Sequence, residues 1–136
     1  MITFTLQQAL DTVVSHLLNG GIRSVRANPD QQAGGPSCLY RGDNGAKCFV
    51  GVLMPDDLYN PTWDDPEGDP MSAQTLCEKG HIGSPDLDFA IALNKLQSIH
   101  DLSMNWDDGV KFNSFGWDNL KRWALTHNLV YPENAP

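Results

Sequence analysis

Positive charge is scarce in this sequence, and this scarcity limits its partners. Nine Lys and Arg residues stand against 17 Asp and Glu residues, which gives a net charge of −8 over 136 residues. An acidic surface repels the phosphate backbone, so the composition disfavours nucleic acid as a partner. Long hydrophobic runs are also lacking: the longest, residues 48–55, is interrupted by Gly51 and falls well short of the roughly 18 residues of a membrane span. We therefore expect neither a nucleic-acid partner nor a membrane partner.

Cysteine is scarce as well, with three residues in the chain. An odd count argues against the disulfide framework of a small secreted protein. The opening residues, MITFTLQQAL, lack the basic segment and long apolar stretch of a secretory signal. We expect a cytoplasmic protein, which means the host cell cytoplasm if a phage encodes it.

The apolar pattern predicts three main helices. Residues 5–19 repeat apolar side chains at helical spacing, with Thr5 and Gln8 as a capping box and Gly20-Gly21 as the stop. A second helix is predicted from Ser84-Pro85-Asp86 to about residue 103, with Leu87 and Leu102 among the residues facing inward. A final helix is predicted over 117–127, with Phe115 on its inner side, and one helical turn is expected around 72–79.

A small amount of β-structure is expected beside these helices. The turn Gly42-Asp43-Asn44-Gly45 predicts a β-hairpin over 38–53, because Asn-Gly tolerates positive φ at both positions. Since CFVGVLM does not alternate cleanly, the second arm has a buried helical turn as its alternative. A short strand is expected over 22–27. The predicted fold is α+β and mainly helical: a single domain over 1–136, with about three helices and a small β-hairpin or short antiparallel sheet.

A small basic spot on this acidic chain is the main candidate binding site. Arg41 and Lys47 flank the predicted turn; one aromatic residue, Tyr40, precedes Arg41, and two more, Tyr59 and Trp63, follow Lys47. Charge and stacking together suit an anionic aromatic ligand such as a nucleotide. The alternative, which we favour, is that the two cations pair with Asp43, Asp56 or Asp57 and only fix the turn. The candidate binding residues are Tyr40, Arg41, Lys47, Tyr59 and Trp63.

Metal binding and cysteine chemistry are weaker hypotheses. A zinc site would use Cys38, Cys48, Cys77 and His81, since Cys77 and His81 have a spacing that places both on one face of a helical turn. Nine residues separate Cys38 from Cys48, which is wider than a zinc knuckle, so buried thiols and no cofactor are the expectation. A cysteine-dependent enzyme would pair Cys48 with His100 or His81. No local signature of a cysteine hydrolase surrounds any of the three cysteines.

The central segment resembles a family of small proteins of unassigned function found in phages and bacterial genomes. The shared pattern is Cys-x-Tyr-Arg-x-x-x-Gly-x-Lys-Cys-x-x-Gly-x-Leu-x-Pro-Asp-x-Leu-Tyr, and residues 96–101 resemble the family's second helix. Val52 stands where the family often has another cysteine, which weakens a zinc site. The residues that carry the resemblance are Cys38, Tyr40, Arg41, Gly45, Lys47, Cys48, Gly51, Leu53, Pro55, Asp56, Leu58 and Tyr59.

This resemblance implies an origin in a phage or mobile element and brings no established activity. Together with the small, acidic composition and the lack of a recognisable catalytic set, it favours a non-catalytic accessory protein. Such a protein would bind and inhibit, or redirect, a host protein, including one of a defence system. The alternatives are a binder that sequesters a nucleotide-like small molecule and the cysteine-dependent enzyme.

Overall fold

The fold is α+β and mainly helical, as predicted. The computed structural model describes residues 1–25, 39–64 and 71–136. Of the residues described, 52% are helical, and they form five α-helices, three of them of seven or more residues, and a small two-stranded antiparallel sheet. No helix in the described ranges is both long and apolar enough to cross a bilayer.

The first helix, α1 (Leu6–Leu18), begins at the predicted capping box. The Thr5 hydroxyl accepts a hydrogen bond from the Gln8 N–H at 3.1 Å, and the Gln8 side-chain oxygen accepts one from the Thr5 N–H at 2.9 Å. This reciprocal pair satisfies two of the N–H groups that a helix start leaves without partners. The apolar face is buried as expected, and its fully enclosed residues are Ala9, Leu10, Val13 and Val14.

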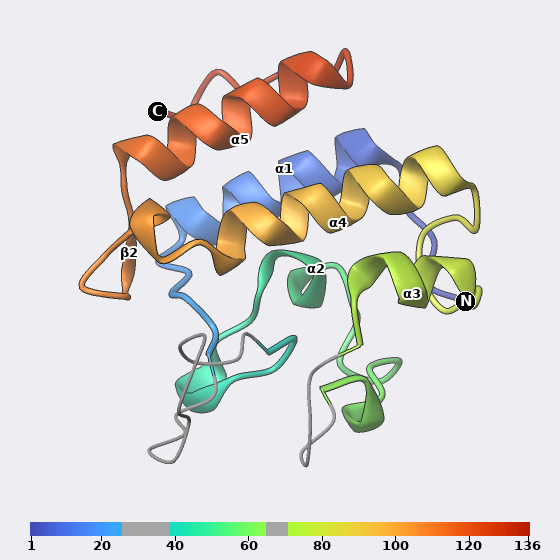
Figure 1. Cartoon of the computed structure of the whole chain (residues 1–136). Coiled ribbons are helices and arrows are strands. Elements are labelled where there is room, and N and C mark those ends of the chain that lie inside the picture. Colours follow the sequence, from blue (N-terminus) through green and yellow to red (C-terminus); the bar gives the residue numbers. More distant parts are fainter. Residues whose placement is uncertain (26–38, 65–70) are drawn as a thin grey trace.

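Helix α4 (Leu87–Asp101) is the centre of the fold. It packs against α2 (Phe49–Val52), α3 (Ala73–Glu78) and α5 (Ser114–Thr126). Figure 1 shows it between α5 on one side and the two short helices on the other. The Asp86 side chain caps its start by accepting a hydrogen bond from the Phe89 N–H at 3.1 Å. Leu87 and Leu102, expected to face inward, are 56% and 48% exposed because they lie at the two ends of the helix.

The C-terminal part contains the small sheet. Strands β1 (Trp106–Asp107) and β2 (Lys111–Phe112) pair in antiparallel register around a turn in which Asp108 and Gly109 have positive φ. Helix α5 begins three residues earlier than predicted, because the Asn113 side chain caps it by accepting from the Gly116 N–H at 3.0 Å. Phe115, predicted on the inner side, is 65% exposed in this first turn.

The hairpin predicted over 38–53 is wrong, and the helical alternative for its second arm is correct. The chain turns at η1 (Asp43–Gly45), with Asn44 and Gly45 at φ 59° and 76°, as the Asn-Gly pair predicts. It then enters α2, so the antiparallel sheet lies at 106–112 instead. Of the strand expected over 22–27, residues 22–25 are described and form no named strand; the Ser24 carbonyl accepts a hydrogen bond from the Leu39 N–H at 3.2 Å.

Candidate functional site

Arg41, the first candidate binding residue, uses its guanidinium inside the chain. Its Nη1 donates to the Gly51 carbonyl at 2.5 Å, and its Nη2 donates to the Met54 carbonyl at 2.7 Å. The Gly51 carbonyl lies in the last turn of α2, where a helix leaves carbonyl groups without intrahelical partners, and the Met54 carbonyl lies two residues beyond the end of the helix. Asp56 accepts a further bond from Nη2 at 3.1 Å. Arg41 therefore closes the end of α2, and its charge is largely enclosed.

Gly51 explains how Arg41 and α2 come so close together. A Cβ atom built on Gly51 would lie 2.2 Å from the carbonyl oxygen of Tyr40, a distance that real Cβ atoms essentially never show. Only glycine lets the backbone of α2 approach the 40–41 backbone this closely. Cys48 caps the other end of α2, where its Sγ accepts a hydrogen bond from the Gly51 N–H at 3.3 Å. The pattern Cys48-x-x-Gly51 thus builds a short, tightly packed helix.

A buried carboxylate, Asp64, ties the two ends of this region together. It lies in η2 (Pro61–Asp64), is 7% exposed, and accepts hydrogen bonds from the Tyr40 N–H at 2.7 Å and the Arg41 N–H at 3.1 Å. The Tyr59 hydroxyl donates to the same carboxylate, and the Tyr59 ring lies 4.7 Å from the Arg41 guanidinium carbon. Burial, together with the Asp64 hydrogen bond, raises the pKa of Tyr59. These noncovalent contacts join residues 39–64 into one unit, which we call the platform.

Lys47 and Trp63 also lie on the platform. Lys47 pairs with Asp56 at 3.5 Å, and the two cations Lys47 and Arg41 hold the pKa of the Asp56 carboxyl below its usual value. Trp63 is 7% exposed and packs against Tyr59 and His81, with ring centroids 6.2 Å and 5.5 Å away. The structure thus brings all five candidate binding residues together, but it pairs Arg41 and Lys47 with Asp56 of the same chain and buries the Trp63 side chain.

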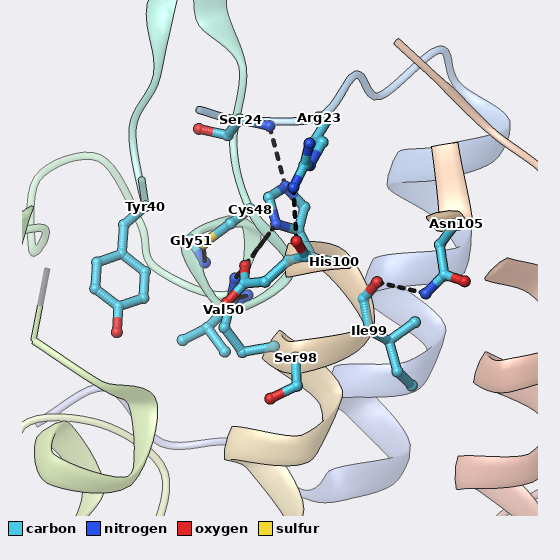
Figure 2. Close-up of polar contacts among 12 residues, drawn as sticks. Arg23, Ser24, Tyr40, Cys48, Val50, Gly51, Ser98, Ile99, His100 and Asn105 are labelled. Atoms are coloured by element: carbon cyan, nitrogen blue, oxygen red, sulfur yellow. Dashed lines mark hydrogen bonds and ion pairs between the residues drawn. The ribbon is translucent and has the colours of Figure 1, made fainter. Parts of the chain in front are cut away.

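A second polar cluster surrounds His100 at the C-terminal end of α4. Its Nε2 accepts a hydrogen bond from the Ser24 N–H at 3.0 Å, and its Nδ1 lies 3.0 Å from the Asp101 carboxylate. Figure 2 shows Arg23 and Ser24 approaching this ring from the same segment; Arg23 donates to the Asp101 carbonyl at 2.6 Å. Gln97 donates to the Asp101 carboxylate at 2.8 Å, and its side-chain oxygen accepts from the N–H of Val50 in α2 at 2.9 Å.

This geometry bears on the cysteine hypothesis. Both ring nitrogens of His100 already have partners, and the His100 side chain is fully buried. Cys48 is 1% exposed, and its sulfur caps α2. A nucleophile must reach a substrate, and in this arrangement neither the Cys48 sulfur nor the His100 ring is exposed at the surface.

The weak zinc candidates within the described residues have different environments. Cys77 is buried in α3, and burial raises the pKa of its thiol to about 11, whereas His81 is exposed at the start of the next segment. Cys38 lies outside the described residues. Within the described ranges, no group of three or more His, Cys, Asp or Glu side chains is arranged to hold a metal ion.

A surface groove runs along the edge of the platform. It has a volume of about 750 Å³, and residues 1–4 form one wall while residues 52–56, Lys47 and Leu58 form the other. A hollow of about 180 Å³ shares Met1, Ile2 and Leu58 with it and extends to Trp63 and His81. We call these two hollows together the N-terminal groove. No sequence pattern indicates this groove, because its two walls are about 50 residues apart in the chain.

The backbone of residue 2 fixes one wall of this groove. The Ile2 N–H donates to the His81 carbonyl at 3.1 Å, and the Ile2 carbonyl accepts from the Gly83 N–H at 2.7 Å, which makes a parallel bridge with Ile82. In an extended chain successive backbone groups point to opposite sides, so those of Thr3 point away from 81–83. Within the described residues, the Thr3 N–H and carbonyl make no hydrogen bond.

Comparisons with known proteins do not place the chain in a family. No family model and no curated protein matches the sequence, and no solved structure matches the fold. The resemblance of the central segment to phage and bacterial proteins therefore stays a prediction from the sequence.

Proposed function

We propose that this chain is a non-catalytic binding protein that inhibits or redirects a host protein, as an accessory factor of a phage or mobile element. The phage setting rests on the sequence resemblance alone. The binding role is supported by the N-terminal groove, which lies beside the platform, where Arg41 and Lys47 are already paired with Asp56.

The exposed apolar residues of the groove support a protein partner. Met1 is 67% exposed and Leu58 is 53% exposed, and both line the two connected hollows. Burying such side chains contributes about 25 cal/mol per Å² of apolar surface, which favours association when a partner covers them. The partner supplies an apolar segment that fills the groove.

The backbone at residue 3 indicates the form of that segment. An extended peptide laid along residues 1–4 would find the Thr3 N–H and carbonyl as hydrogen-bond partners, in the manner of strand addition. The opposite wall carries the Lys47–Asp56 ion pair, which offers polar contacts at the rim of the groove. The proposed ligand is therefore an extended segment of a host protein with apolar side chains.

The test compares two exposed leucines. Leu58→Asp places a charge in the groove, whereas Leu125→Asp places the same charge on α5, at a side chain that is 63% exposed and lines neither hollow of the N-terminal groove. Each tagged protein is incubated with bacterial lysate, and retained proteins are quantified by mass spectrometry. A host protein retained by the wild type and by Leu125→Asp, but lost with Leu58→Asp, supports the proposal.

The retained protein is then purified, and its affinity and activity are measured with and without the chain. Tight binding that changes the activity of the purified protein supports inhibition or redirection. Enrichment of no protein by the wild type, or equal retention by both variants, would overturn the proposed function. Circular dichroism spectra identical to the wild type show that neither leucine variant has lost its fold.

A further inference from the structure

His100 joins two distant parts of the chain through a bond that depends on its protonation state. The imidazole Nε2 accepts from the Ser24 N–H, 76 residues away in sequence, and a nitrogen can accept only when it carries no proton. The Nδ1 position faces the Asp101 carboxylate and therefore carries the ring proton. The neutral ring thus satisfies both neighbours at once.

The surroundings of the ring disfavour a second proton. Phe49 and Trp106 pack against the imidazole, with ring centroids 5.3 Å and 5.5 Å away. The charged groups that face it are the Asp101 carboxylate on α4, the Arg23 guanidinium on the preceding segment and, when protonated, the His16 ring on α1. Helix α2 contributes no charged side chain. Burial lowers the pKa of His100, and the attraction of Asp101 only partly opposes this effect.

Ser24 in turn holds the start of the platform. Its carbonyl accepts the Leu39 N–H at 3.2 Å, and a Cβ built on Gly42 would lie 2.4 Å from its hydroxyl oxygen. The 39–42 backbone therefore lies directly on Ser24. Arg41, which closes α2, belongs to this same stretch. A chain of contacts therefore runs from His100 through Ser24 to residues 39–42 of the platform.

We propose that His100 is a proton-sensitive clasp, and that uptake of one proton from solvent at Nε2 releases residues 22–25 from α4 while the helices remain folded. An imidazolium donates from both nitrogens, so its Nε2–H would face the Ser24 N–H, donor against donor. The released segment would free the Ser24 amide and loosen the contact with residues 39–42. This inference concerns the folded chain itself and does not depend on the proposed function.

The test is amide hydrogen exchange followed by NMR between pH 7.5 and pH 5.0, with correction for the intrinsic pH dependence of exchange. The Val13 amide, in the interior of α1, is the internal reference. If release is linked to one proton, opening at Ser24 rises by about tenfold per pH unit below the ordinary histidine pKa of roughly 6.5. The Val13 amide reports global unfolding, so it should remain better protected than Ser24 at every pH, and dilute urea should speed its exchange but not that of Ser24, because a local opening exposes little surface. Equal protection of Ser24 and Val13 with the same urea dependence, or no pH-dependent loss at Ser24, would overturn the clasp.

Two variants separate His100 from other titrating groups. His100→Gln supplies an uncharged acceptor near the position of Nε2, so protection at Ser24 should become independent of pH. His127→Gln, in which a histidine beyond the end of α5 is replaced, is the matched control and should keep the wild-type profile. An unchanged pH profile in His100→Gln would refute the proposal. If that variant does not fold, the wild-type comparison of Ser24 with Val13 decides alone.

Discussion

Arg41→Met should destabilise the chain strongly, although the salt bridge of Arg41 lies at the surface. The substitution keeps most of the apolar stem and removes the guanidinium, which is enclosed in a side chain only 18% exposed. The lost bonds to the Gly51 and Met54 carbonyls are charge-assisted, and each such bond contributes roughly 1.5–3 kcal/mol. The Gly51 carbonyl keeps a second bond from the Met54 N–H, so we expect a total loss of about 3 kcal/mol rather than the full sum.

Asp56→Asn provides the matched control for this prediction. It removes the ion-pair partner of Arg41 but leaves both carbonyl bonds in place. The Asp56 side chain is 81% exposed, and exposed ion pairs contribute little to stability, so we expect no measurable loss. Arg41→Lys should fall between the two, because an ammonium group cannot reach both carbonyls with the fork geometry of arginine.

The measurement is urea unfolding of the three variants, with the free energy of unfolding extrapolated to water. A cost below about 1 kcal/mol for Arg41→Met, the value for a single neutral hydrogen bond, would refute the role of the two carbonyl bonds. So would an Asp56→Asn variant that costs as much as Arg41→Met, since the ion pair would then be the dominant contact.

Two further predictions concern the platform and the histidines. Gly51→Ala gains up to about 1 kcal/mol of helix propensity, but its Cβ would lie 2.2 Å from the Tyr40 carbonyl oxygen, so we expect a net loss of about 2 kcal/mol in urea unfolding; a stabilised variant would contradict the close approach. Burial lowers the pKa of both His16 and His100, so the unfolded chain binds more protons than the folded chain, and stability should be fully present above pH 6.5 and fall as the pH decreases below it. Melting temperatures at pH 7.5 and pH 5.0 check this sign, and an unchanged or higher value at pH 5.0 would count against it.

The helices can be predicted from the sequence because their signals are local. The capping box of Thr5 and Gln8 and the Asp86 cap lie within three residues of the groups that they bind. The pattern wrongly predicts Leu87 and Phe115 to face inward, because periodicity does not show where a neighbouring element ends. Both lie in the first turn of a helix, where the packing partner no longer covers them.

The predicted hairpin is wrong because its turn depends on local sequence, whereas the structure of its second arm depends on contacts with residues farther along the chain. Asn44 and Gly45 do adopt positive φ, so the local turn chemistry is interpreted correctly. The helix after this turn depends on a sulfur cap from Cys48 and on Arg41 bonding to carbonyls 10 and 13 residues away. The 106–112 sheet is missed, although its Asp108-Gly109 turn is a hairpin signal, because its strands have only two residues each.

The sequence predicts which residues form the candidate site, but it does not predict most of the contacts that these residues make. The pairing of Arg41 and Lys47 with Asp56, which we favoured over a ligand, is present in the structure. The roles of Asp64 and Ser24 depend on contacts across 23 or more residues, and no local pattern reports them. The same holds for the groove, whose walls meet only after the chain has folded.

The contacts between tryptophan and histidine rings make the tryptophans intrinsic fluorescence probes of histidine charge. Three of its four tryptophans each lie beside a different histidine ring, with centroids 5.2–5.5 Å apart, and the fourth packs on Phe112. A protonated imidazole quenches the fluorescence of an indole ring that it contacts. Variants that retain a single tryptophan would therefore report the charge of one histidine at a time. The three pairs are Trp63 with His81, Trp106 with His100, and Trp123 with His127.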